Sequence, residues 1–185
     1  MNPLRSFLNL FGAKPKPSTA ANQQWLQGYE AFEAGKRHYA GRRHEEAVAC
    51  FDEAVECGFE DGELFSLRGS SLQALKWNID AIEDFTRAIS TEPDDCNLYF
   101  QRAMSKVSIG DQLGFLADVQ EAIRLSRVES EATRAYNTYA NETGHESVTQ
   151  IYQFQLMMQG EMPEFLVAKR VEEAELRGRR KNKPQ

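Results

Sequence analysis

The feature that most constrains this chain of 185 residues is an internal repeat with a period of 34 residues. The central copy is the segment 62–95, GELFSLRGSSLQALKWNIDAIEDFTRAISTEPDD, and similar residues stand one period before and after it. The matching positions are Gly35, Gly69 and Ala103; Phe51, Phe85 and Val119; Ala54, Ala88 and Ala122; and Ala31, Phe65 and Tyr99. A fixed period over three copies indicates a stack of similar units that bury their apolar faces against one another.

The landmarks of the central copy identify the kind of unit. Gly69 is followed by Ala81, three further residues and Phe85, and Pro93 closes the copy. This order of glycine, Ala-x3-Phe and proline, together with the period of 34, resembles the tetratricopeptide repeat. The resemblance implies an all-α fold, a tetratricopeptide-type solenoid of antiparallel helix pairs, each made of a helix A and a helix B.

The repeat register divides the chain into segments. An N-terminal segment and linker (1–19) precede the solenoid (20–176), and a basic tail (177–185) follows it. Within the solenoid we expect repeats at about 28–61, 62–95 and 96–129, a degenerate fourth copy at 130–163, and a capping helix at 164–176. The capping helix is expected because an uncapped solenoid exposes an apolar end.

The first repeat departs from the family pattern at its end. Phe59 stands where the closing proline is expected, with Gly58 beside it. Because glycine adopts the left-handed conformation that ends many helices, we expect Gly58 to terminate helix B. Trp25 precedes this repeat and is expected to cover the open end of the stack.

The N-terminal segment carries its own apolar pattern. Leu4, Phe7, Leu8 and Phe11 recur at three- and four-residue spacings, which is typical of a short amphipathic helix. Such a helix would bind a membrane surface or a partner, or would fold only against an apolar groove, including the chain's own. The apolar stretch is too short and too interrupted for a secretory signal.

The charge distribution is uneven along the chain. The formal net charge is −6, but residues 1–17 carry +3 and residues 177–185 carry +5, which leaves −14 on residues 18–176. An acidic body argues against nucleic acid as a partner. The three cysteines, Cys50, Cys57 and Cys96, lack metal-type spacing and favour a reducing, cytoplasmic compartment.

No pattern of residues indicates a catalytic, metal-binding or phosphate-binding site. The histidines His38, His44 and His145 have no ligand spacing with cysteines or carboxylates, and no glycine-rich phosphate motif is present. We therefore expect no enzyme activity, no catalytic residues, no metal and no cofactor.

A concave groove lined by the A helices is the expected binding surface. The positions turned away from helix B lie one residue after, three before and four after the small reference residue of each repeat. The partner-binding residues predicted in this way are Tyr29, Phe32, Lys36, Tyr39, Leu67, Ser70, Phe100, Gln101, Met104 and Val107, with Ser66, Arg134 and Thr138 beside them. Aromatic and methionine side chains in this list suit a peptide with apolar anchors. An alternative is that helix curvature buries several of these residues, or that the N-terminal segment covers them.

The resemblance also implies a test of one known ligand. In this family a carboxylate clamp of lysine, asparagine and arginine holds the acidic C-terminus of cytosolic heat-shock chaperones. The corresponding positions here hold Phe32, Lys36, Leu67, Asn97 and Gln101. Only Lys36 has a suitable charge, so the sequence argues against that ligand.

Two functions follow from these patterns. The first is a non-catalytic protein–protein interaction scaffold in the cytoplasm, which binds a peptide or helix with apolar anchors in its groove. The alternative is a membrane-peripheral assembly factor anchored by residues 1–17. The partner and the oligomeric state are left open by the sequence.

Overall fold

The structure is a computed structural model that describes residues 19–159. All regular elements in this part of the chain are α-helices, so the predicted all-α fold class is confirmed. The helices are α2 (Thr19–Ala40), α3 (His44–Glu56), α4 (Gly62–Ala74), α5 (Asn78–Thr91), α6 (Cys96–Ser108), α7 (Gln112–Leu125), α8 (Glu131–Glu142) and α9 (Val148–Met158). The segment 1–18 and the predicted capping helix and tail lie outside the described residues.

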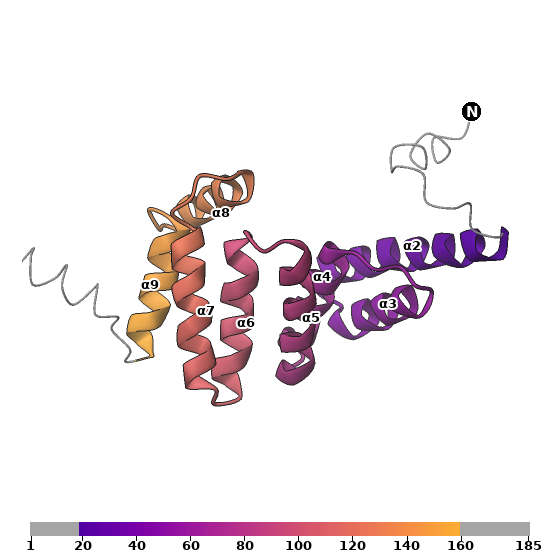
Figure 1. Ribbon diagram of the computed structural model, residues 1–185, viewed down its shortest axis with the longest axis horizontal. Coiled ribbons are helices and arrows are strands. Elements are labelled where there is room, and N and C mark those ends of the chain that lie inside the picture. The colour runs from indigo at the N-terminus through magenta and orange to yellow at the C-terminus, as the bar shows by residue number, and fades with distance from the viewer. Residues whose placement is uncertain (1–18, 160–185) are drawn as a thin grey trace, which may run out of the picture.

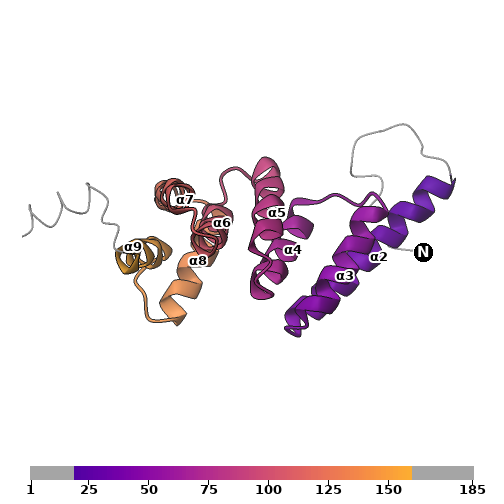
Figure 2. The ribbon, with the colours of Figure 1, turned by 90° about the horizontal axis from the view of Figure 1, so that it is seen from below.

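Three helix pairs form the body of an elongated solenoid (Figure 1). Helices α2 and α3, α4 and α5, and α6 and α7 pack as neighbouring pairs, and α3 and α5 also pack on the first helix of the next pair. The two views agree that the α2–α3 pair lies at one end of the molecule and α9 at the other (Figures 1 and 2). This is the A–B stacking that the 34-residue period predicts.

Small residues lie where the two helices of a pair come closest. A Cβ atom added at Gly35 would stand 2.5 Å from Cε1 of Phe51, and one added at Gly69 would stand 3.1 Å from the corresponding ring atom of Phe85. In the third pair, Ala103 replaces the glycine of helix A and Val119 replaces the phenylalanine of helix B, and both residues are fully buried. The facing positions are thus Gly35 with Phe51, Gly69 with Phe85, and Ala103 with Val119.

Four left-handed residues mark the turns between the helices of each copy. Arg42, Lys76, Gly110 and Gly144 have φ angles of 56°, 67°, 83° and 86° and stand 34 residues apart. The backbone of this turn is therefore kept in all four copies. Gly58, with φ of 75°, follows the C-cap of α3 and ends that helix as the sequence indicates.

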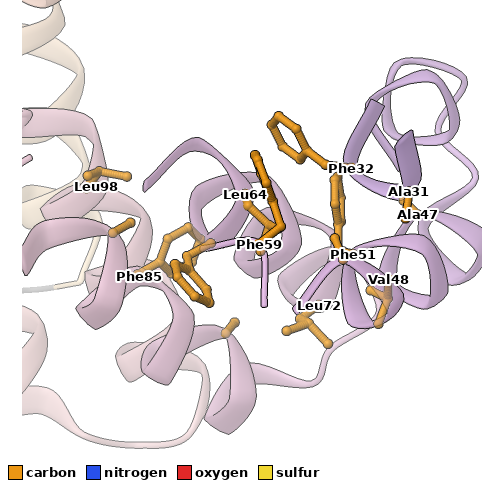
Figure 3. Close-up of a cluster of buried hydrophobic side chains, with 14 residues drawn as sticks. Ala31, Phe32, Ala47, Val48, Phe51, Phe59, Leu64, Leu72, Phe85 and Leu98 are labelled. Atoms are coloured by element: carbon orange, nitrogen blue, oxygen red, sulfur yellow. The ribbon is translucent and has the colours of Figure 1, made fainter. Parts of the chain in front are cut away.

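Aromatic rings close the core at the N-terminal end (Figure 3). Phe59 folds back against Phe32, with ring centroids 5.1 Å apart, and Phe32 also contacts Phe51 at 6.1 Å. Trp25 stacks on Tyr29 at 5.9 Å and packs on Phe59 at 5.6 Å, while 42% of its surface stays exposed. Trp25 therefore covers this end of the core, as expected.

The fourth copy forms two helices that do not continue the stack in the regular way. In a regular stack the first helix of this copy would pack on α7, but α9 occupies that place, and Figure 1 shows α8 across the upper end of the α6–α7–α9 layer. Tyr152 of α9 is fully buried, stacks on Phe100 with ring centroids 4.4 Å apart, and donates a hydrogen bond to the Cys96 sulfur at 3.6 Å. The backbone N–H of Val148 donates to the Asn137 side chain at 2.9 Å and fixes the start of α9 to α8.

A buried ion pair repeats in the second and third pairs of helices. Arg68 binds Asp84 through two nitrogens at 2.7 Å each, and Arg102 binds Asp118 in the same way at 2.8 Å. Both carboxylates are almost completely buried, so each needs a cationic partner, and Asp118 has a second one in Lys106 at 2.8 Å. The pairs join helix A to helix B in their repeats, on positions that are 34 residues apart.

Candidate functional site

Two hollows lie side by side along the surface of α4 and α6, the A helices of the second and third repeats. The first has a volume of about 350 Å³ and the second about 340 Å³. The first is lined by Gly62, Glu63, Ser66, Leu67, Glu92, Asp95, Leu98 and Tyr136. The second is lined by Ser70, Gln73, Ala74, Lys76, Asn78, Met104 and Ser108. The lining residues of α4 recur at helical spacing from Gly62 to Ala74, so the two hollows follow one another along one face of this helix, which we call the groove.

Two N-cap residues lie at one end of the groove. Asp61 is the N-cap of α4 and its carboxylate accepts a hydrogen bond from the Glu63 N–H at 2.8 Å. Asp95 caps α6 in the same way and accepts from the Asn97 N–H at 2.8 Å. Because Gly62 and Glu63 begin α4 and Asp95 caps α6, the first hollow lies at the N-termini of both helices.

The first hollow is acidic. Glu63, Glu92 and Asp95 line it, and burial raises the pKa of Glu92, with further contributions from the negative charges of Asp95, Asp61 and Glu63. The Tyr136 hydroxyl donates a hydrogen bond to the other Asp95 oxygen at 2.9 Å, and burial raises the pKa of this tyrosine well above its usual range. An acidic surface of this kind attracts cations and repels acidic peptides.

The second hollow is less charged. The Gln73 side-chain amide donates hydrogen bonds to the backbone carbonyl of Gln101 at 2.9 Å and to the Ser105 hydroxyl at 2.8 Å. These bonds join α4 to α6 at the hollow. Met104 stands at its wall and is half-buried. Since methionine adapts its shape to different neighbours, this wall suits an apolar side chain.

The predicted groove residues of the first repeat fall into two groups. Phe32 is wrongly placed in the groove by the sequence, because it is only 4% exposed and packs in the core. Tyr29 and Tyr39 are half-buried, and Tyr39 packs edge-on against His44. Lys36 forms ion pairs with Glu33 at 2.9 Å and with Glu63 at 3.8 Å, so its charge is already balanced within the chain.

In the second and third repeats the structure brings several predicted residues together. Leu67 lines the first hollow, and Ser70 and Met104 line the second. Gln101 lines neither hollow, but its backbone carbonyl accepts a hydrogen bond from Gln73 in the wall of the second. Val107 and Phe100 instead pack on the C-terminal core, where Tyr152 of α9 covers the Phe100 ring.

The acidic part of the site was missed by the sequence analysis. Glu92 and Asp95 stand in the connection between α5 and α6, and Tyr136 comes from α8 in the degenerate copy. The face of helix A alone cannot indicate residues that loops and a displaced helix bring to it. The acidic residues Glu92, Asp94 and Asp95 at the boundary between the second and third repeats were the sequence signal that could have indicated it.

The described residues hold no group of three His, Cys, Asp or Glu side chains that could bind a metal ion. In residues 19–159 no helix has the length and apolar character needed to cross a membrane. At the positions that correspond to the family's carboxylate clamp, Leu67, Asn97 and Gln101 are uncharged side chains.

Sequence comparison finds one similar region. No protein-family model matches the chain. A Dictyostelium discoideum protein described as a STIP1 homolog is 33% identical over 76 residues, which cover 41% of this chain. The match spans only 14% of that much longer protein.

Solved structures share the fold over most of the chain. A complex of the TPR2B domain of yeast Sti1 with an Hsp70 segment has a TM-score of 0.56 at 20% identity and covers 72% of this chain and 98% of that one. MamA has a TM-score of 0.53 at 14% identity, with coverage of 85% and 86%. The first TPR of Spaghetti (RPAP3), bound to the HSP90 peptide SRMEEVD, has a TM-score of 0.51 at 17% identity, with coverage of 64% and 94%. At these identities the likeness shows the fold.

Proposed function

We propose that this chain, a tetratricopeptide-repeat solenoid, is a non-catalytic scaffold that binds a peptide or helix of another protein along the groove of α4 and α6. The observation that carries the proposal is the pair of aligned hollows, each with a half-buried apolar side chain, Leu67 in the first and Met104 in the second. Hollows spaced along one helix accept successive apolar anchors of an extended or helical ligand.

The similar structures support a peptide as the ligand. The yeast Sti1 domain is in complex with an Hsp70 segment, and the Spaghetti domain is bound to an HSP90 peptide. Here, however, Glu63, Glu92 and Asp95 make the first hollow acidic. A ligand rich in carboxylates, such as SRMEEVD, would meet like charges, so we propose an apolar-anchored ligand that is neutral or basic.

The proposed contact surface keeps most of the residues that the sequence predicts. It comprises Leu67, Ser70, Gln101 and Met104 along α4 and α6, with Tyr29, Lys36 and Tyr39 on the neighbouring α2, whereas Val107 packs on the C-terminal core. Phe32 and Phe100 are left out of this surface, because Phe59 stacks on the first ring and Tyr152 on the second.

The cytoplasm is the proposed compartment. Cys50, Cys57 and Cys96 are all free thiols, which suits a reducing environment. The membrane-peripheral alternative depends on residues 1–17, which lie outside the described residues. Co-sedimentation of the full chain and of a variant lacking these residues with anionic vesicles tests it, and equal sedimentation would exclude it.

A pair of matched variants tests the groove. L67Q/M104Q places two amides of similar size at the proposed anchors, whereas I79Q/L113Q makes the same kind of change at two residues that are 64% and 80% exposed on B helices. Both are compared with the natural chain by affinity capture from lysate and mass spectrometry, after circular dichroism confirms equal helicity.

The proposal predicts that a bound protein is lost with L67Q/M104Q and kept with I79Q/L113Q. A synthetic peptide from that protein should then bind the natural chain directly and bind the groove variant at least about tenfold more weakly, a loss expected for a buried anchor. Capture that is unchanged in L67Q/M104Q would show that the groove is not the binding surface.

A further inference from the structure

The acidic hollow holds negative charge that no close ion pair within the described residues balances, although Asp95 accepts hydrogen bonds from the Asn97 N–H and the Tyr136 hydroxyl. Within residues 19–159, Glu92 and Asp95 form no ion pair, and Glu63 has only the long contact of 3.8 Å to Lys36. Lys36 itself lies closer to Glu33, at 2.9 Å. Three carboxylates in one hollow with so little compensation favour a cationic occupant.

The rest of the lining suits a long basic side chain. Leu67 and Leu98 provide an apolar floor, and Tyr136 adds an aromatic ring. Lysine and arginine pack their aliphatic stems on apolar surface while the charged head reaches polar groups at the rim. An aromatic ring also attracts a cation over its face. The hollow therefore matches the shape of such a side chain as well as its charge.

The chain carries a segment with this chemistry. Residues 177–183, RGRRKNK, contain five cations and no acid. The segment lies outside the described part of the structure, which ends at Gln159. It contains no large apolar residue that would compete for the body's core, so its interactions with the acidic body are governed by charge.

The segment is within reach of the hollow. Helix α9 has 11 residues and is about 16 Å long, and its first residue, Val148, is bonded to Asn137, the neighbour of Tyr136. The end of α9 thus lies within about 30 Å of the hollow, allowing for the width of α8. The 18 residue steps from Gln159 to Arg177 span up to about 60 Å when extended, and still about 38 Å if the predicted helix at 164–176 forms.

We propose that the basic segment 177–183 occupies the acidic hollow, with an arginine or lysine side chain on Leu67, Leu98 and Tyr136 and its charge against Glu63, Glu92 and Asp95. Covalent attachment gives the segment an effective concentration of about millimolar, so even weak contacts keep it bound. The segment then covers part of the peptide groove and competes with basic ligands for it. This inference goes beyond the proposed function, because it needs the hollow but no partner protein.

Amide NMR spectra of the full chain test the proposal. The natural chain is compared with a tail variant in which the five cations become glutamine, written R177Q/R179Q/R180Q/K181Q/K183Q. We expect the amide shifts of Gly62, Glu63, Ser66, Leu98 and Tyr136 to differ between the two chains. Adding about 0.5 M NaCl should bring the natural spectrum toward that of the variant, because salt screens exposed charge contacts.

A peptide added in trans and two charge pairs make the test specific. The synthetic peptide RGRRKNKPQ, titrated into the tail variant, should restore the shifts. Combining the tail variant with E63Q/E92Q should weaken this binding about fivefold or more, from the loss of two charge contacts. Combining it with E45Q/E46Q, which removes two exposed charges from α3, should leave the affinity unchanged.

Three results would overturn the proposal: no shift difference between the natural chain and the tail variant, differences that gather away from the hollow, or equal weakening by both glutamine pairs. The last would mean diffuse attraction to the acidic body. None of these bears on partner capture by Leu67 and Met104, so failure here leaves the proposed function separately testable.

Discussion

The two buried ion pairs predict unequal effects of the same substitution. Arg68 is the only cation that forms an ion pair with Asp84 in the described chain, and Asp84 is 2% exposed. In the next repeat, Asp118 contacts both Arg102 and Lys106, each at 2.8 Å. Replacing the arginine therefore leaves one carboxylate buried without an ion pair and the other still paired.

The expected cost follows from this difference. R68M keeps the aliphatic stem but strands Asp84, and removing one partner of a buried pair costs about 3–5 kcal/mol of unfolding free energy. R102M should cost about 2 kcal/mol less, because a charged hydrogen bond from Lys106 remains. For a chain of this size, such a gap separates the two melting temperatures by about 4–8 °C.

Urea unfolding followed by circular dichroism measures the gap, and pH supplies a second readout. Burial is the largest cause that raises the pKa of Asp84, and loss of Arg68 raises it further. A carboxyl whose pKa is higher in the folded than in the unfolded chain binds protons more tightly when folded, so lowering the pH favours folding. The deficit of R68M should thus shrink as pH falls toward the usual carboxyl range.

A double variant separates the stranded charge from lost packing. R68M/D84L replaces the pair with apolar groups and should recover more than half of the loss in R68M, since apolar replacement of a buried pair is often neutral. Equal costs for R68M and R102M, or no recovery in the double variant, would refute the reasoning that an unpaired carboxylate causes the loss.

Two further predictions concern packing and alkaline stability. Gly35→Ala should destabilise the chain to urea by about 1–3 kcal/mol, more than Gly69→Ala, because its new Cβ would meet the facing phenylalanine ring at 2.5 rather than 3.1 Å; equal midpoints would contradict this. Burial raises the pKa of Tyr136 and Tyr152 above the ordinary value of 10.0, so folding keeps both protonated where unfolded tyrosine ionises. The free energy of unfolding should hold below pH 10 and fall above it, and the tyrosinate absorbance of these two residues should rise only as helicity is lost. Ionisation of all tyrosines before helix loss would argue against the burial of Tyr136 and Tyr152.

The sequence predicts the regular part of the fold because its period is encoded in side-chain size. Gly69 faces Phe85 and Ala103 faces Val119, so each small residue on helix A is matched to the bulk opposite it. Helix position and helix pairing follow from this matching. The buried Arg68–Asp84 pair obeys the same period, although its polar residues escape a search for apolar stripes.

Phe32 shows where this reasoning stops. Its place three residues before Gly35 puts it on the outer face of helix A. The connection between α3 and α4, however, has Phe59 where a proline is expected, and the Phe59 ring packs on Phe32. The ring is then buried at 4% exposure. A position on one helix cannot reveal cover that a neighbouring loop supplies.

The fourth copy carries the same lesson to the binding site. Its turn keeps the left-handed glycine, Gly144, yet its helices are placed by Tyr152, whose buried ring needs the space beside Phe100 and Cys96. Helix α9 therefore takes the position of a regular helix A, and α8 is left to carry Tyr136 to the acidic hollow. The carboxylates of the hollow come from the regular repeats, but its aromatic wall depends on a departure from the repeat, so a ligand that contacts Tyr136 recognises the part of the chain where periodicity fails.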